Sequence, residues 1–386
     1  MNFRAIAYVM GTLLLVTGGA LLVPALVALI YGEGDLVALL ISAVIAGVIG
    51  LPLRLRFVRG TVLETRDAIV IAAFGWIIIS AVSALPYMIH GAIPSFTDAF
   101  FEMMSGFTTT GATILTDIES VPHGLLFWRS ETHLLGGMGF LTLTIIFLPH
   151  GMGGLRIFRA ESSPGQVITK ERFTARNRDA ILYLWVIYLA LNAFQIVLMF
   201  LGGMSLFDSC CHAFGTVSTS GYSPYNSSIG HYNSAYFDWV IIVFMFLGGV
   251  TFMLYYHAFR GDWKTLRVNT ELRWYLGFMA VLCGSVTWIL WRDGTYDFPD
   301  ALRYGAFQVT SLLTTTGFTT ADYELWPQAG QMIRVVVCFI GACAGSTTSG
   351  IKVVHYVLSW KFMVGAIKTI FFPPLSVLSV RINGHP

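Results

Sequence analysis

The stretch FEMMSGFTTTG, at residues 101–111, is the first of three related stretches in the chain. CHAFGTVSTSG at 211–221 and FQVTSLLTTTG at 307–317 share its ending, a serine or threonine, a threonine, a second serine or threonine, and glycine. The three glycines follow one another at intervals of 110 and 96 residues (221 − 111 and 317 − 221). Self-similarity of this kind indicates a repeat architecture. The interval is too long for a solenoid and suits a two-helix membrane unit with its loops.

The composition around these stretches is that of a polytopic membrane protein. Of 386 residues, 55% are hydrophobic and only 11% are charged, with a mean hydropathy of +0.70. A soluble protein carries about 25% charged residues. Crossing a hydrocarbon core of roughly 30 Å takes about 20 apolar residues, and runs of that length recur along the chain. The first run, about 6–31, is too long for a signal peptide, so we interpret it as a retained helix.

Each stretch lies between two apolar spans, which predicts a repeated helix, pore loop, helix unit. Short apolar segments such as 98–107 and 301–313 directly precede the repeated endings and suit re-entrant half-helices. The expected fold is therefore all-α and polytopic, with three such units around a central ion pore. The expected segments are two peripheral transmembrane helices at 1–60, pore units at 61–160, 170–262 and 270–362, the last with an interrupted second helix, and a cytoplasmic connection at 363–386.

Basic residues predict the orientation of the chain. Arginine and lysine gather in three connections, around 54–66, 156–178 and 260–273, whereas the alternate connections at about 91–127 and 204–237 contain neither. By the positive-inside rule the basic connections are cytoplasmic, which places the N-terminus on the cytoplasmic side. The repeated endings then all lie in outward-facing connections.

The residue types of the repeated endings fit the binding of a dehydrated cation such as K⁺. A dehydrated ion needs rings of oxygens, which backbone carbonyls of an extended loop can provide. Glycine permits the required backbone angles, and hydroxyls can satisfy backbone groups that an unwound segment exposes inside a membrane. A half-helix entering from outside also directs its partly negative C-terminal end at the membrane centre. The endings hold no carboxylate, which argues against a high-field Na⁺ or Ca²⁺ site.

The candidate selectivity filter comprises twelve residues, and a metal site for K⁺ is expected at the second and third residue of each ending. A single Thr/Ser/Gly cluster more often marks close packing of membrane helices, but three occurrences at one place of a repeat favour ion binding. The filter residues are Thr108, Thr109, Thr110 and Gly111, then Ser218, Thr219, Ser220 and Gly221, then Thr314, Thr315, Thr316 and Gly317. The K⁺ ligands are expected at Thr109, Thr110, Thr219, Ser220, Thr315 and Thr316.

A second polar stretch interrupts the last long apolar span. Glycine and hydroxyl residues at 341–350 cannot hold a helix well in the middle of a span that runs to Trp360. Unwound backbone at that depth requires surrounding protein or water. We interpret the stretch as a mobile gate, with a packing kink as the alternative. The gate loop comprises Gly345, Ser346, Thr347, Thr348, Ser349, Gly350 and Lys352, where Lys352 is either a snorkelling residue or a pore-lining charge.

Charged residues also occupy comparable positions in the helices that follow the filter endings. Arg129, Asp238 and Arg334 lie 18, 17 and 17 residues beyond their glycines (129 − 111, 238 − 221 and 334 − 317). We expect interfacial anchors at these positions, with an effect on ions at the outer mouth as the alternative.

These motifs resemble the TrkH/KtrB/HKT superfamily of potassium transporters, over essentially the whole chain and closest to TrkH. WRSETHLLGGMG at 128–139 is similar to the helix after the family's first filter, and GACAGSTTSGIK at 341–352 to its loop beneath the filter. The resemblance implies K⁺ uptake across the bacterial cytoplasmic (inner) membrane, with K⁺ as the transported ion and no organic cofactor. It further implies a homodimer with a cytoplasmic nucleotide-binding subunit of TrkA/KtrA type. Lipid surrounds the chain, and nucleic acid is not an expected partner.

The resemblance also has departures and alternatives. Family members have four units around one pore, whereas this chain shows three, and 363–386 resembles the connection to a fourth. In the family, glycine at the first filter distinguishes K⁺ selectors from relatives that carry serine there and admit Na⁺, and Gly111 is glycine. A K⁺/H⁺ or K⁺/Na⁺ symporter remains the alternative function. An enzyme is not expected, because no G-x-S-x-G, H-E-x-x-H or P-loop pattern occurs.

Overall fold

The computed structural model describes residues 1–56, 64–139 and 177–371, and most of these residues are in helices. Within this part of the chain the single β-type pairing is an isolated parallel bridge between Ile340 and Ile351. The described residues form two compact units, one that ends at residue 231 and one that begins at residue 232. The expected all-α polytopic fold is confirmed.

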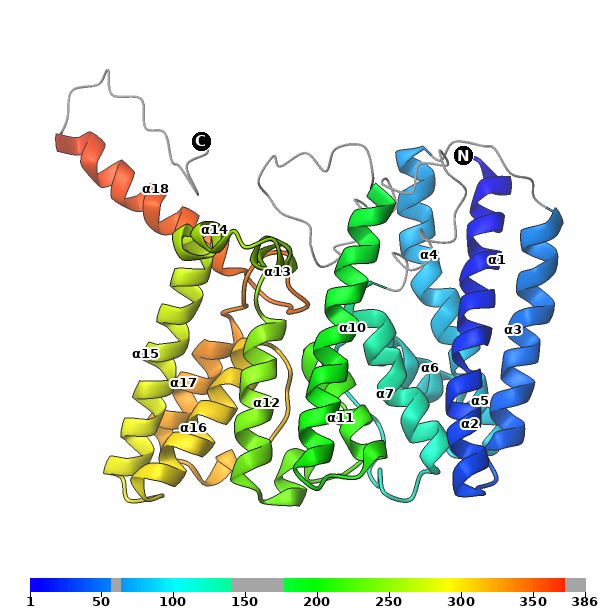
Figure 1. Ribbon diagram of the computed structural model, residues 1–386, viewed down its shortest axis with the longest axis horizontal. Coiled ribbons are helices and arrows are strands. Elements are labelled where there is room, and N and C mark those ends of the chain that lie inside the picture. The colour runs from blue at the N-terminus through cyan, green and yellow to red at the C-terminus, as the bar shows by residue number, and fades with distance from the viewer. Residues whose placement is uncertain (57–63, 140–176, 372–386) are drawn as a thin grey trace. The chain divides into compact units, whose positions relative to one another are not determined.

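The helices are, in the first compact unit, α1 Phe3–Ala20, α2 Leu22–Tyr31, α3 Leu36–Arg56, α4 Thr65–Ser83, α5 Leu85–His90, α6 Phe96–Phe107, α7 His123–Gly137, α10 Asn177–Leu201 and α11 Leu206–Val217. A short 3-10 turn, η1 Ser228–Tyr232, leads into the second compact unit. There follow α12 Ala235–Gly248, α13 Phe252–Phe259, α14 Trp263–Val268, α15 Thr270–Arg292, α16 Phe298–Leu313, η2 Tyr323–Leu325, α17 Gln328–Cys338 and α18 Val353–Phe371 (Figure 1).

Among the described residues, five spans are long and apolar enough to cross a membrane, or six if the bent pair α12 and α13 counts as one. In the first compact unit α1 runs beside α3 (Figure 1). Their backbones meet at two glycines, because a Cβ on Gly11 would lie 2.7 Å from the Gly50 carbonyl oxygen. Small residues allow such close approach between membrane helices. The α1–α3 pair thus packs through backbone contact.

The helices next to the repeated endings are short. In the first compact unit α6 packs against α7, and α11 lies between α7 and α10. In the second compact unit α16 packs on α15 and α12, with α17 close by (Figure 1). All three short helices, α6, α11 and α16, end immediately before a repeated ending. Each therefore delivers the chain into a signature loop.

One expected straight span is broken. In the pore unit at 170–262 the second helix is expected to be uninterrupted, yet the chain bends by 94° between α12 and α13. The break follows Gly248 and Gly249, whose low helix propensity lets the helix end, and Thr251 starts the next helix. Parts of other expected segments lie outside the described residues, namely 57–60 of the N-terminal helices, 61–63 and 140–160 of the first pore unit, 170–176 of the second, and 372–386 of the C-terminal connection.

Candidate functional site

The three signature loops, residues 108–111, 218–221 and 314–317, have the same backbone conformation. The middle threonines Thr109, Thr219 and Thr315 have φ angles of 53°, 56° and 55°. The glycines have φ angles of 75°, 83° and 85° in the same order. Positive φ is unfavourable for a β-branched residue, and such strain clusters at functional sites. A strained conformation that recurs three times points to a shared task.

Hydroxyl groups join each loop to the helix that precedes it. Thr108 donates through Oγ1 to the Met104 carbonyl at 2.7 Å, and Thr314 donates in the same way to Thr310 at 2.7 Å. Ser218 makes the corresponding bond to Phe214. In each loop the first and third hydroxyls also hydrogen-bond each other, at 2.9, 2.5 and 2.8 Å in chain order. The hydroxyls thus satisfy helix-end carbonyls, as Ser and Thr can in membranes.

The loop N–H groups bond back to the same helices. The third residue of each loop donates to the helix carbonyl five positions earlier, Thr110 to Ser105 at 2.9 Å, Ser220 to Gly215 at 2.9 Å and Thr316 to Ser311 at 2.8 Å. With N–H groups and hydroxyls used in this way, backbone carbonyls are the ligands that a loop can offer to a cation. The helix C-termini contribute partial negative charge in the same region.

The first and second signature loops touch each other. A Cβ built on Gly111 would lie 1.9 Å from the Ser220 carbonyl oxygen, so a side chain fits there only if the backbone shifts. By contrast, a Cβ on Gly317 would meet no atom within 4 Å. Gly111 is therefore required both by its positive φ and by space, whereas Gly317 is required by its positive φ alone.

Two of the three charged residues beyond the glycines, Arg129 and Asp238, are buried inside the protein and are not interfacial anchors. Arg129 is 2% exposed and donates through Nε to Glu102 at 2.7 Å, and Asp238 is 3% exposed, 3.5 Å from Arg303. Arg334 lies over the ring of Tyr323 at 3.4 Å. Position along the helix suggested an interface, but the helices that carry Arg129 and Asp238 are covered by neighbouring helices. Burial of an ion pair is expensive unless it is well hydrogen-bonded.

The gate loop, residues 345–350, lies between α17 and α18. The Ile340–Ile351 bridge closes its base, where Gly341 N–H donates to the Ile351 carbonyl at 2.9 Å. Gly345 and Gly350 have φ angles of 74° and 80°. The loop therefore interrupts the helix by a hydrogen-bonded turn with glycines at its ends.

The broken α12–α13 span forms hydrogen bonds with residues 343–345, which lead into the gate loop and are called the gate segment below. Gly249 accepts a hydrogen bond from Cys343 N–H at 3.1 Å, and Thr251 donates through Oγ1 to the Ala344 carbonyl at 2.7 Å. Phe252 N–H in turn donates to the Gly345 carbonyl at 3.2 Å. Each interrupted helix thus satisfies the backbone groups that the other leaves open, which is necessary inside a membrane.

The gate loop also contacts the third signature loop. Ser349 N–H donates to the hydroxyl of Thr315 at 2.9 Å, and Thr315 is the strained residue of that loop. Lys352 donates through Nζ to the Thr348 carbonyl and, at 3.1 Å, to the Thr348 hydroxyl. The lysine therefore binds the gate loop itself.

Two residues that the sequence analysis missed hold the gate segment. Glu271, in the first turn of α15 and 8% exposed, accepts a hydrogen bond from Ala344 N–H at 2.5 Å through Oε1. Thr251 is the other, through the bond to Ala344 described above. From the sequence alone, Glu271 is indistinguishable from an ordinary acidic residue at a helix N-terminus. The glycines before Thr251 were the available signal for the break.

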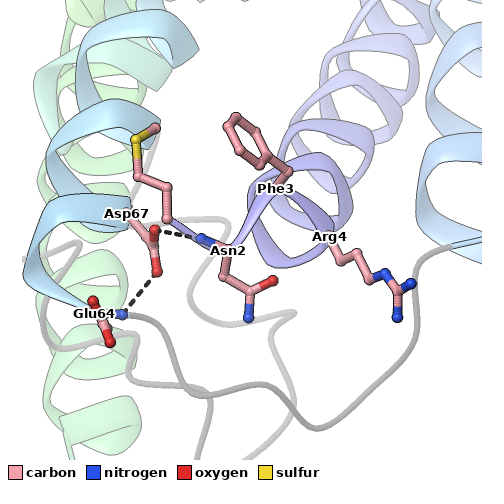
Figure 2. Close-up of a pocket in the computed structure, with 6 residues that line it drawn as sticks. Asn2, Phe3, Arg4, Glu64 and Asp67 are labelled. Atoms are coloured by element: carbon pink, nitrogen blue, oxygen red, sulfur yellow. Dashed lines mark hydrogen bonds between the residues drawn. The ribbon is translucent and has the colours of Figure 1, made fainter.

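An open pocket at the start of the chain has a different character. It is lined by the first four residues together with Glu64 and Asp67. Figure 2 shows Asp67 accepting hydrogen bonds from the backbone N–H groups of Asn2 at 2.9 Å and Glu64 at 3.1 Å. Both carboxylate oxygens cap helix ends, so the pocket joins the starts of α1 and α4 and belongs to the scaffold.

Comparison with known proteins agrees with these features. The model of the TrkH family, described as cation transport protein, matches residues 39–290 and 294–385. The Trk system potassium uptake protein TrkH of Salmonella typhimurium is 34% identical over 396 residues, covering 100% of this chain and 80% of that relative. TrkG of Escherichia coli is 34% identical over 387 residues, covering 99% and 79%.

A solved structure has the same fold. The crystal structure of the potassium transporter TrkH from Vibrio parahaemolyticus superposes with a TM-score of 0.86 at 29% identity, covering 100% of this chain and 80% of that one. The family match extends over most of the chain and includes all three signature loops and the gate loop. The chain therefore belongs to the TrkH family of cation transport proteins.

Proposed function

We propose that this chain is the membrane subunit of a Trk-type system that takes K⁺ up across the bacterial cytoplasmic membrane. The observation that carries the proposal is the single strained backbone conformation shared by the three signature loops. Similar proteins are named as potassium uptake proteins. We assign the chain no enzymatic role.

In the proposed mechanism the signature loops act as a selectivity filter. K⁺ exchanges its water for backbone carbonyls at the second and third residues of each loop, which are Thr109, Thr110, Thr219, Ser220, Thr315 and Thr316. The loop hydroxyls and N–H groups stay bonded to the preceding helices and hold the carbonyls in place. The helix C-terminal ends stabilise the cation further. The path is channel-like.

The gate loop, together with Lys352, closes this path at rest. Its bonds to Thr315 and to the α12–α13 break support this role, because they connect the loop to both the third signature loop and a neighbouring helix interruption. Deleting residues 346–349 is expected to raise K⁺ flux and remove its regulation. A deletion that left flux and regulation unchanged would contradict the gate assignment.

The proposed assembly is a homodimer in lipid with a cytoplasmic nucleotide-binding subunit of TrkA/KtrA type. The N-terminus lies on the cytoplasmic side in this proposal. The capping of α1 and α4 by Asp67 supports it, because α4 begins at the basic connection around 54–66, which is expected to be cytoplasmic, and α1 starts beside it. Coupled symport with H⁺ or Na⁺ is the competing mechanism. Currents that persist without a proton or Na⁺ gradient favour the channel-like path, and currents that vanish favour symport.

The filter is tested by replacing its glycines. Gly111→Ser and Gly221→Ser are expected to let in more Na⁺, because a side chain strains the positive-φ backbone and shifts the carbonyls. Reversal potentials would be measured in mixed K⁺ and Na⁺, with the chain alone and joined to the C-terminal part of a relative. Unchanged reversal potentials in both variants would rule out the filter assignment.

A further inference from the structure

A fully buried cluster of side chains lies behind the first and second signature loops. Glu102 on α6 is 0% exposed, Arg129 on α7 is 2% exposed, and Tyr222, which follows the second loop, is 1% exposed. Arg129 donates through Nε to Glu102 Oε1 at 2.7 Å and lies 3.5 Å from the centre of the Tyr222 ring. His133, one helical turn after Arg129, stacks on the same ring at 3.9 Å.

This cluster binds the chain segments that directly follow both loops. Glu102 accepts hydrogen bonds from the Thr113 hydroxyl at 2.9 Å and from Ile114 N–H at 3.0 Å, just beyond Gly111. Arg129 donates to the Ser223 carbonyl at 3.0 Å, just beyond Gly221. Within this ion pair, Glu102 therefore binds the residues that follow the first loop, and Arg129 binds the residue that follows Tyr222, beyond the second loop.

The Tyr222 hydroxyl joins the two loops directly. Tyr222 is the residue after Gly221, and its hydroxyl lies 2.9 Å from the Glu102 carbonyl and 3.1 Å from the carbonyl of Ala112, the residue after Gly111. The loops themselves are in backbone contact, since Gly111 has no room for a Cβ beside Ser220. The hydroxyl therefore links the residue after Gly221 to the residue after Gly111.

We propose that Glu102, Arg129 and Tyr222 are positioning residues that set the K⁺ over Na⁺ selectivity of the first two signature loops. The proposal rests on the filter function proposed above and names what holds its carbonyls at the K⁺ distance. Na⁺ is smaller than K⁺, so carbonyls that can move inward accommodate it better. A buried, hydrogen-bonded network resists that movement because each broken bond leaves a polar group without water.

The test compares two buried tyrosines that lose the same group. Tyr222→Phe removes the hydroxyl that joins the loops and keeps the ring against Arg129. Tyr87→Phe is the matched control, because Tyr87 is 0% exposed and its hydroxyl donates to the Leu125 carbonyl on α7 at 2.7 Å, a bond that involves neither loop. We expect the K⁺/Na⁺ permeability ratio to fall about fivefold in Tyr222→Phe, the change that loss of one hydrogen bond brings, and to stay unchanged in Tyr87→Phe.

A second measurement does not require transport. A ligand that binds the folded protein raises its melting temperature, so purified protein is expected to be stabilised more by KCl than by NaCl. Tyr222→Phe should shrink that difference, and Arg129→Lys should shrink it too because lysine cannot reach both Glu102 and Ser223 as the guanidinium does. Tyr87→Phe should lower the melting temperature equally in both salts.

The outcomes separate this proposal from the filter proposal. If Gly111→Ser and Gly221→Ser change selectivity while Tyr222→Phe and Arg129→Lys behave like Tyr87→Phe, the cluster is only structural and the positioning proposal is wrong. If the glycine variants also leave selectivity unchanged, the filter assignment is wrong, and the positioning proposal that rests on it is wrong as well.

Discussion

The first and third signature loops share one backbone conformation but have different neighbours. The first is pressed against the second loop and backed by the Glu102–Arg129 pair. The third has open space at Gly317, and its strained Thr315 is bonded to the gate loop. The conformation is therefore a local property of each loop and its helix, while the surroundings decide what each loop responds to. We infer that the first loop serves selectivity and the third couples the filter to the gate.

The largest difference between the two loops is expected at their glycines. Gly111→Ala places a Cβ onto the Ser220 carbonyl and should lower K⁺ transport far more than Gly317→Ala does, because the backbone of the second loop must shift to make room. Gly317→Ala meets no atom within 4 Å and has only the positive φ to oppose it, about 1 kcal/mol. We expect it to retain transport reduced by roughly tenfold or less.

Rubidium uptake, normalised to the amount of protein in the membrane, measures both variants. Equal losses in Gly111→Ala and Gly317→Ala would show that backbone conformation alone governs both positions. The contrast between a crowded first loop and an open third loop would then carry no functional meaning.

The parts that sequence predicted are those that short stretches encode. The signature loops and the interrupted last helix follow from local patterns, since serine, threonine and glycine act on backbone within a few residues of themselves. The supporting contacts join residues far apart in the chain, such as Tyr222 to Glu102 across 120 positions and Ala344 to Glu271 across 73. A single sequence holds no signal for such pairs, so Arg129 was interpreted as an anchor and Glu271 was missed.

A second, smaller difference is expected at the middle threonines. Thr315→Val keeps the branched shape but removes the hydroxyl that accepts from Ser349 N–H. Loss of one such bond is worth about 1 kcal/mol, so we expect closed-state K⁺ flux to rise roughly fivefold. Thr315→Ser, which keeps a hydroxyl, should stay close to the parent protein.

Thr109→Val makes the same change at the equivalent place of the first loop and should leave closed-state flux low. Flux is measured as rubidium leak under conditions in which the parent protein is closed. An equal rise in Thr109→Val and Thr315→Val would mean that the hydroxyl matters for the filter generally, and that the bond from the gate loop has no part in holding the gate closed.

The smallest effect is expected from loosening the gate segment at its other end. Glu271→Gln keeps the shape of the side chain but replaces a charge-assisted bond to Ala344 N–H with a neutral one. Charge-assisted bonds are about twice as strong as neutral ones, so the segment should open more often without losing its fold. We expect amide hydrogen exchange of the gate segment to speed up about threefold, which corresponds to roughly half the energy of a hydrogen bond.

Glu33→Gln is the matched control, because Glu33 accepts from the backbone N–H of His123 at 2.5 Å in the first compact unit. Exchange at the gate segment should be the same in Glu33→Gln as in the parent. Faster exchange in both variants would mean that the loss of either carboxylate loosens the protein as a whole. Unchanged exchange in Glu271→Gln would show that the bonds from the α12–α13 break and from Thr315 hold the gate segment without Glu271.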